Sequence, residues 1–406
     1  MNTLKKIQAL SSLETLTGKE LAELQQYLIS VEKQPGGPYF VSSDVAENSR
    51  FNAKVYRLYK QQGIELPGAL HYASLYSTID TEPSAQKQST RPVDSSSFYL
   101  LTNTLPHILP PTAYKKVTPL LSALEKTDSR GEISRLSERF AECLTPLHRT
   151  KNKSIKALAT ANLYAWAAYS LYDTLIDEES DPAYINIANI LSRESQRIYG
   201  THPKVYSLFT RVDTAMLTEL STRTALHYSK ESITLHAPPS KSLLIKLLSE
   251  RSIVHILGPL LLVKCSEEEM HHLEQALAYY CAARQLLDDI HDWQEDLLEG
   301  RYTYVIHCLV QSASLKAATP YPTHSYLPKL QALFWEQELP TLLHKAITLA
   351  NTSEKLLKKL SLFKEITPFT SLTTGHVKEN ATAALQRYSQ EKEYLQSIRS
   401  RQKGRK

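Results

Sequence analysis

Most of this chain consists of long segments with the residue pattern typical of helices, and this pattern constrains the fold more than any other feature of the sequence. From about residue 112 onward, no stretch alternates with period two for long enough to indicate a sheet. Prolines fall near the breaks between segments, and only 11 of 406 residues are glycine, which is scarce for sheet-rich folds. We therefore predict an all-α fold, a large helical bundle. The expected helices span 112–127, 131–146, 153–179, 183–199, 203–228, 240–263, 267–299, 326–362 and 375–398.

Four regions follow from spacing and composition. Residues 1–80 are expected to be an additional N-terminal helical segment, since Leu21, Leu24 and Leu28 recur at helical spacing. Residues 81–97 are polar and rich in serine, as expected of a flexible loop or linker. The bundle should occupy 98–395. The last region, 396–406, is basic, and we interpret it as a solvated tail rather than a nucleic-acid site.

Several classes of protein are disfavoured by composition. The four cysteines are far apart and form no CxxC pair, which argues against a zinc site or disulfide framework and suits a cytoplasmic location. No uninterrupted apolar run reaches about 18 residues, so no integral membrane span is expected. The N-terminus also lacks the apolar core and cleavage site of a signal peptide.

A first acidic cluster ends an apolar segment. Residues 161–182 are apolar nearly all round until Asp173, so this helix is expected in the centre of the bundle. Asp173 and Asp177 are four residues apart and share a helix face. Two carboxylates at the end of a buried helix are costly unless a positive group binds them. The alternative is a polar helix end facing solvent, which the helix dipole disfavours.

A second acidic cluster lies in residues 278–301. Asp288, Asp292 and Asp296 recur every four residues and form one stripe, opposite an apolar side. Their mutual repulsion is tolerated if a divalent cation offsets it, and ligand sets made only of oxygen suit Mg²⁺. The alternative is a solvated acidic face. Arg284, one turn earlier, either pairs structurally with Asp288 or reaches a diphosphate oxygen.

Together the two clusters resemble the class I isoprenoid synthases. QLLDDIHD at 285–292 resembles the second aspartate-rich motif of trans-prenyltransferases. DIHDWQEDLLEGR at 289–301 resembles the second motif of squalene and phytoene synthases, and YDTLIDEE at 172–179 resembles their first motif. The spacing of the acidic stripe is also similar to the metal triad of terpene cyclases.

This resemblance implies a shared helical fold with an apolar cavity between two aspartate helices. It also implies about three Mg²⁺ ions bridging the carboxylates and the substrate diphosphate. A carbocation formed there needs a dry pocket, where aromatic faces such as that of Tyr169 would stabilise it. The length of the prenyl substrate that reacts should depend on Ala165 or Ala168, because larger side chains there would shorten the cavity. The residues expected to act in catalysis are Asp173, Asp177, Asp288 and Asp292, and these four together with Asp296 are expected to bind the metal ions. The residues expected to bind the diphosphate are Arg284, Arg301, Arg387 and Tyr388. The residues expected to line the pocket are Tyr169, Gly258 and Gln285.

Two departures from the family pattern narrow the choice among the activities that the family performs. The first motif reads DxxxD rather than DDxxD, which counts against chain elongation. The tyrosine-rich motif of head-to-head synthases is replaced by residues 251–264, where Gly258-Pro259 should break a helix. In cyclases a broken helix at a similar place lines the pocket; the alternative is a simple turn between helices.

We therefore expect a Mg²⁺-dependent enzyme that ionises an allylic prenyl diphosphate, as a terpene cyclase or a head-to-head condensing synthase. The alternatives are a chain elongase that uses isopentenyl diphosphate and a non-catalytic helical scaffold. The expected partner is the prenyl diphosphate and not a nucleic acid; peripheral membrane contact and a homodimer remain open.

Overall fold

A computed structural model describes residues 103–403 of the chain, except 129, 151–153 and 178–180. This part is an all-α bundle, as predicted, with one small sheet. The expected N-terminal segment (1–80) and linker (81–97) lie outside the described residues, and so do the side chains of the basic tail. The helices are α6 (Pro111–Thr127), α7 (Leu136–Cys143), α8 (Ile155–Asp177), α9 (Ala183–Tyr199), α10 (Pro203–Thr222), α11 (Lys241–Glu250), α12 (Leu257–Leu262), α13 (Glu267–Leu298), α14 (Tyr304–Ser312), α15 (Thr323–Leu333), α16 (Leu339–Leu357), α17 (Thr367–Thr370) and α18 (His376–Lys403).

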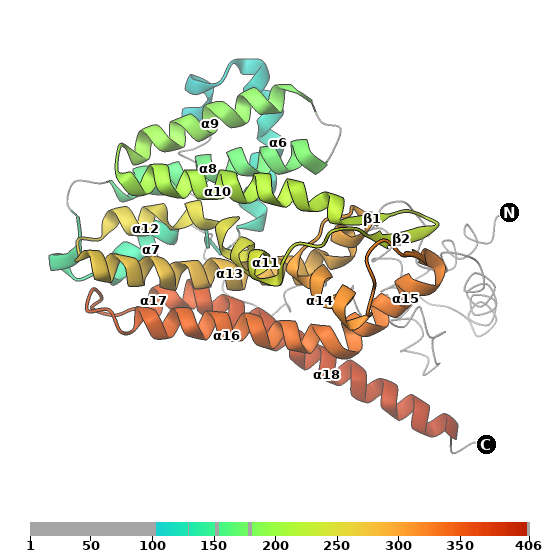
Figure 1. Ribbon diagram of the computed structural model, residues 1–406. Coiled ribbons are helices and arrows are strands. Elements are labelled where there is room, and N and C mark those ends of the chain that lie inside the picture. The colour runs from blue at the N-terminus through green and yellow to red at the C-terminus, as the bar shows by residue number, and fades with distance from the viewer. Residues whose placement is uncertain (1–102, 129, 151–153, 178–180, 404–406) are drawn as a thin grey trace, which may run out of the picture.

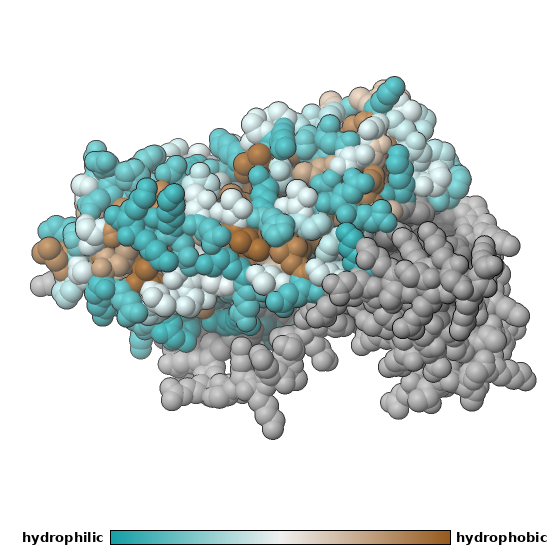
Figure 2. Space-filling view, turned by 90° about the horizontal axis from the view of Figure 1, so that it is seen from below, coloured by the Kyte–Doolittle hydropathy of each residue, from teal (hydrophilic) through white to brown (hydrophobic). Residues whose placement is uncertain are grey.

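The helices are stacked in layers around α13 (Figure 1). One layer holds α6, α8, α9 and α10, the middle holds α7, α12 and α13, and the bottom holds α16, α17 and α18. The sheet, α14 and α15 lie together at one end of the bundle, and the C-terminal part of α18 projects beyond its body. Figure 2 views the bottom face, which is mostly hydrophilic, with apolar residues in small separate groups.

The central position expected for the apolar helix is confirmed in α8. Leu163, Ala167 and Leu171 pack into a core cluster with α6 and α9. Ala161 and Ala165 pack into a second cluster with α7, α12 and α13. Both sides of α8 are therefore covered, which explains a segment that is apolar nearly all round.

α13 is the longest helix and places the second acidic cluster. A capping box starts it: the Ser266 hydroxyl accepts the Glu269 N–H at 3.2 Å, and the Glu269 carboxylate accepts the Ser266 N–H at 3.0 Å. On its predicted apolar side, Leu286 and Trp293 are fully buried, and the Trp293 ring stacks on Phe334 with centroids 4.6 Å apart. The opposite side is left for polar residues.

The expectation of no sheet is wrong at one end of the bundle. β1 (Leu226–Tyr228), β2 (Ser232–Leu235) and β3 (Pro320–Pro322) form an antiparallel sheet in the order β1-β2-β3. The helix predicted over 203–228 accordingly ends at Thr222, where a 3-10 turn leads into β1. Strands of three or four residues are too short for alternation to be recognised.

The helix predicted over 240–263 is broken, but before Gly258-Pro259 rather than at it. α11 ends at Glu250, a 3-10 turn spans Ile253–Ile256, and α12 starts at Leu257. Pro259 therefore lies in the first turn of α12, where its missing N–H is not needed. This break places Arg251 at the end of α11, a position that matters for the site.

Two further helix boundaries differ from the predicted ones for local reasons. α7 begins at Leu136 rather than at 131, because the Asp128 carboxylate accepts the N–H groups of Ile133 and Ser134 at 2.9 and 2.8 Å. These bonds hold a turn where a helix was expected. The segment expected over 326–362 forms α15 and α16, joined by a π turn at Phe334–Glu338. Within the described residues, no helix is long and apolar enough to cross a membrane.

Candidate functional site

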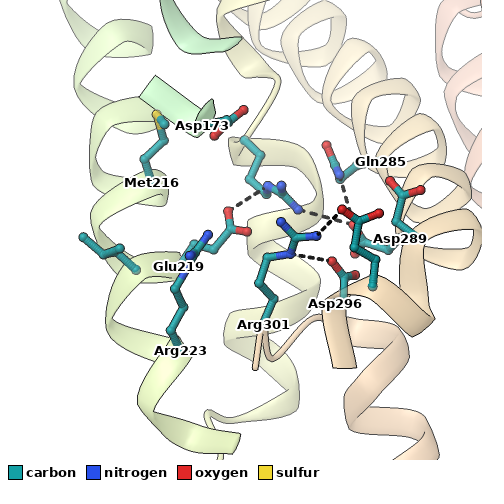
Figure 3. Close-up of a pocket in the computed structure, with 12 residues that line it drawn as sticks. Asp173, Met216, Glu219, Arg223, Gln285, Asp289, Asp296 and Arg301 are labelled. Carbon is teal, nitrogen blue, oxygen red and sulfur yellow. Dashed lines mark hydrogen bonds and ion pairs between the residues drawn. The ribbon is translucent and has the colours of Figure 1, made fainter. Parts of the chain in front are cut away.

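A polar pocket of about 260 Å³ lies where α8, α10 and α13 meet (Figure 3). The first acidic cluster supplies Asp173 to it, and the second supplies residues from α13. Side chains of the two clusters, far apart in the sequence, therefore line one pocket, but this pocket is polar, whereas the cavity expected between the two aspartate helices was apolar. The lining residues are Asp173, Met216, Glu219, Leu220, Arg223, Arg251, Gln285, Asp289, Asp292, Glu295, Asp296 and Arg301.

The face that α13 turns toward the pocket differs from the predicted stripe. Gln285, Asp289, Asp292 and Asp296 line the pocket, whereas Asp288 is exposed and is not among the lining residues. Positions i, i+4, i+7 and i+11 keep one direction on a helix of 3.6 residues per turn, while steps of four drift around it. Asp289 thus stands where Asp288 was expected.

Arg251, which the sequence analysis did not single out, crosses this pocket from the end of α11. Its guanidinium lies 2.8 Å from a Glu219 carboxylate oxygen and 3.3 Å from Asp289 Oδ1. The Gln285 amide donates to the same Asp289 oxygen at 3.0 Å and accepts from the Ser252 hydroxyl at 3.4 Å. An arginine on the otherwise apolar face of a predicted helix was the signal available for it.

Arg301, a predicted diphosphate ligand, lies in the pocket just after α13. Gly300 turns the chain with φ +72°, a conformation that favours glycine, and a Cβ there would lie 2.8 Å from the Leu226 carbonyl oxygen. The Arg301 guanidinium then reaches back over the helix end, 2.8 Å from Asp296 and 2.8 Å from Glu299. Both ion pairs are formed within one chain segment, so the position of Arg301 depends on that turn.

Crowded burial makes these carboxylates reluctant to ionise. Burial raises the pKa of Asp289 to about 7, although the Arg251 charge opposes the change. Burial likewise raises the pKa of Asp292 to about 6 and, together with the Asp289 charge, raises the pKa of Asp296 well above its usual range. Six acidic side chains and three arginines line the pocket, so an added cation would be stabilised there.

The donors suit a hard divalent cation by their chemistry. The acidic residues of the pocket offer only oxygen, which is the ligand set of Mg²⁺. Their spacing is less suited: among the described residues, no group of three or more His, Cys, Asp or Glu side chains is close enough to hold a metal ion. A cation would therefore have to draw the carboxylates together, in competition with Arg251 and Arg301.

Four other predicted site residues lie away from this pocket. Arg284 is 3.7 Å from Glu132, which also pairs with His376. The Tyr169 hydroxyl donates to Asp213 at 2.8 Å. Gly258 packs against Ser137, and a Cβ on Gly258 would lie 1.9 Å from the Ser137 hydroxyl oxygen. The Tyr388 hydroxyl donates a hydrogen bond to the Glu336 carbonyl oxygen at 3.5 Å.

Two more predicted residues are described only by their backbone. Asp177 is the last residue of α8, and Arg387 lies in α18. Their side chains are outside the described part of the structure. The metal and diphosphate roles given to them remain predictions.

The fold and this pocket together define an all-α bundle with a pocket rich in carboxylates and arginines. No family model matches the chain, and a search of curated proteins finds no match. Among solved structures, the chain is similar to a decaprenyl diphosphate synthase from Rhodobacter capsulatus, with a TM-score of 0.49 and 12% identity over 72% of this chain and 97% of that one.

Proposed function

We propose that this protein is a Mg²⁺-dependent class I isoprenoid synthase that ionises an allylic prenyl diphosphate, as a terpene cyclase or a head-to-head condensing synthase. One observation carries the proposal: Asp173 and the carboxylates of α13 face the same pocket as Arg251 and Arg301. Carboxylates for a cation and guanidiniums for phosphate oxygens are the two components of a diphosphate site.

The carboxylates would hold the metal. Asp173, Asp292 and Asp296 face the pocket and are the predicted ligands, and Asp289 joins them because it lies on the same face. Asp177 and Asp288 were also predicted for the three-ion site; of these, Asp288 is exposed and does not line the pocket. Bound Mg²⁺ would stabilise the charge that builds on the leaving diphosphate.

The arginines would bind and orient the diphosphate. Arg251 and Arg301 are already paired with the buried carboxylates of Asp289 and Asp296, so their guanidiniums are held in the pocket before a ligand arrives. The planar guanidinium matches phosphate oxygens with two parallel hydrogen bonds. Gln285, bonded to both Asp289 and Ser252, would fix the orientation of the Asp289 carboxylate.

Incubation with Mg²⁺ and C10, C15 and C20 diphosphates, with and without isopentenyl diphosphate, tests the proposal. Product analysis should find hydrocarbon or alcohol and released diphosphate without isopentenyl diphosphate. Longer diphosphates formed only with isopentenyl diphosphate would identify a chain elongase instead. No consumption of any substrate, together with no diphosphate binding, would favour the helical scaffold.

A further inference from the structure

The break between α11 and α12 sets the point from which Arg251 reaches across the acidic pocket. Arg251 is the residue that caps the end of α11, and the 3-10 turn Ile253–Ile256 follows before α12 begins at Leu257. A 3-10 turn has poorer hydrogen-bond geometry than an α-helix, so its position depends more on contacts with other elements. Those contacts therefore also decide where the Arg251 side chain starts.

One such contact comes from Asn162, an exception in the apolar segment of α8. Asn162 is completely buried, with 0% of its surface exposed. Its amide nitrogen donates to the Ile133 carbonyl oxygen at 2.9 Å, and its amide oxygen lies 2.8 Å from His255 Nδ1. A buried amide is costly unless both of its ends are hydrogen-bonded. Asn162 therefore links the turn before α7 to the break after α11.

The chemistry of the partners fixes the direction of the bond to His255. A carbonyl oxygen only accepts, so the end of Asn162 that faces Ile133 is its NH₂ group, and the end that faces His255 is its oxygen. That oxygen cannot donate, so His255 Nδ1 carries the hydrogen. Burial lowers the pKa of His255 to about 3, and the Arg284 charge acts in the same direction. The ring thus stays neutral at neutral pH and holds one tautomer.

Ser252, next to Arg251, is held from the other side by α13. Its hydroxyl donates to the Gln285 amide oxygen at 3.4 Å, and its carbonyl oxygen accepts the Cys281 thiol at 3.7 Å. Both contacts are long, whereas the bond between His255 and the buried Asn162 measures 2.8 Å. The bond to Asn162 is therefore the strongest of these three anchors.

We propose that Asn162 and His255 are positioning residues: together they hold the break between α11 and α12 so that Arg251 lies across the acidic pocket, within reach of a diphosphate. The part that concerns diphosphate rests on the proposed function, but the placement of Arg251 does not. Neither Asn162 nor His255 is among the residues that line the pocket, so each acts through Arg251.

Arginine Nε–H resonances of the full chain test the placement without a ligand. Arg251 Nε lies 2.8 Å from Glu219, and Arg301 Nε lies 2.8 Å from Asp296. Each ion-paired Nε–H gives a signal that is assigned by its loss in Arg251→Lys or Arg301→Lys. His255→Leu removes the donor to Asn162 and should shift or broaden the Arg251 signal while the Arg301 signal stays unchanged.

The matched control is Ser195→Ala. Ser195 is as buried as Asn162, and its hydroxyl donates to the Ala161 carbonyl oxygen at 2.7 Å. This is also a buried hydrogen bond to α8, but it comes from α9 and does not involve the break. Ser195→Ala should therefore change neither arginine signal.

Calorimetric titration with inorganic diphosphate and Mg²⁺ tests the part that concerns the ligand. His255→Leu should weaken binding at least about tenfold, because a displaced Arg251 loses charge-assisted hydrogen bonds to the diphosphate. His255→Gln keeps a donor for the Asn162 oxygen and should recover most of that loss. In an Arg251→Gln background, His255→Leu should cost less than about twofold more, since no guanidinium is left to position. Ser195→Ala should leave the affinity unchanged.

The outcomes separate the two proposals. Wild-type protein that does not bind inorganic diphosphate with Mg²⁺ contradicts the proposed function, while the Nε–H signals still decide the placement. An unchanged Arg251 signal in His255→Leu, or an equal change of both arginine signals, overturns the positioning role. Additive losses of affinity in His255→Leu and Arg251→Gln overturn it as well, because His255 would then act independently of Arg251. If His255→Leu does not fold, Asn162→Ser, which shortens the other partner of the bond, is read by the same criteria.

Discussion

Two neighbouring aspartates in α13 have opposite surroundings. Asp288 is exposed, whereas Asp289 is buried, faces the pocket and contacts Arg251 and Gln285. Both belong to the DD pair of the motif, and Asp288 rather than Asp289 was predicted for the site. The helix phase set by the buried Trp293 decides between them.

The first prediction compares these two carboxylates. Asp289→Asn and Asp292→Asn should each lower turnover at least about 100-fold, equivalent to ~2.7 kcal/mol of barrier, because both line the pocket proposed to bind the diphosphate. Asp288→Asn should cost markedly less. Initial rates at saturating Mg²⁺ measure the effect, and melting temperatures should be unchanged or raised because crowding is relieved. Equal losses in Asp288→Asn and Asp289→Asn would favour the predicted stripe over the pocket face.

The second prediction concerns pH. Because burial raises the pKa of Asp289 in the folded chain to about 7, from an ordinary 3.8, the folded state binds more protons than the unfolded state between these values. The free energy of unfolding contributed by this group should therefore fall as pH rises from about 4 to about 7. Urea unfolding in EDTA at several pH values, for wild type and Asp289→Asn, isolates this contribution. Parallel pH profiles for the two proteins would contradict it.

The residues that sequence reasoning missed come from outside the motifs. Glu219 and Arg251 lie near helix ends between the two acidic clusters. The one local signal is that Arg251 interrupts an apolar helix face, and nothing in its own segment marks Glu219. Asp173, Asp292, Asp296, Arg301 and Gln285 were predicted, and the pocket brings them together. Burial and pairing across helices decide the rest, and neither can be read from a single segment.

Helices long enough to show several turns of periodicity were predicted well, and short elements were not. α13 was expected over 267–299 and spans Glu267–Leu298, because its capping signal and its apolar side are both local. β1 and the turn before α7 depend on contacts with other segments or on one side chain. Such contacts compete with helix propensity, but they produce no repeating pattern of apolar residues by which they could be recognised in the sequence.

The third prediction concerns the turn that ends α13. Gly300→Ala should destabilise the protein by about 1–3 kcal/mol, because it forces a positive φ and a 2.8 Å approach to the Leu226 carbonyl. It should also weaken diphosphate binding at least about tenfold, since a displaced Arg301 loses a charge-assisted hydrogen bond worth ~1.5–3 kcal/mol.

Ser266→Ala at the opposite end of the same helix is the matched control. Loss of its cap should cost about 1 kcal/mol of stability without changing diphosphate affinity. Urea unfolding and calorimetry measure the two quantities. A similar fall in affinity in both variants would mean that Gly300 acts through general stability and not through Arg301.

At the scale of the molecule, the bundle brings an excess of negative charge to one pocket. The fourth prediction is that diphosphate release requires Mg²⁺, with Mn²⁺ as a substitute, because the acidic side chains provide only oxygen ligands. Full turnover in excess EDTA would refute it. The matched binding measurement is stability: Mg²⁺ and diphosphate together should raise the free energy of unfolding by about 2.7 kcal/mol when the ligand is at 100 times its Kd, and the melting temperature should rise with it.

The all-α class was predictable because it rests on patterns within single helices, whereas the meeting of the two distant clusters was expected only from the family resemblance. The layering of those helices was not, since it depends on which apolar faces meet. α8 illustrates the difference: its sequence predicts burial, but only the packing shows that its two sides belong to separate core clusters.

The two-sided helix α13 also limits how the length of this chain can vary. One face carries Asp289 and Asp292 to the pocket, and the other buries Leu286 and Trp293 in the core. One inserted residue between them would rotate everything downstream by about 100° and shift it by ~1.5 Å. Carboxylates would then turn away from the pocket while Trp293 turned out of the core, so insertions and deletions should be tolerated between the helices and excluded from this one.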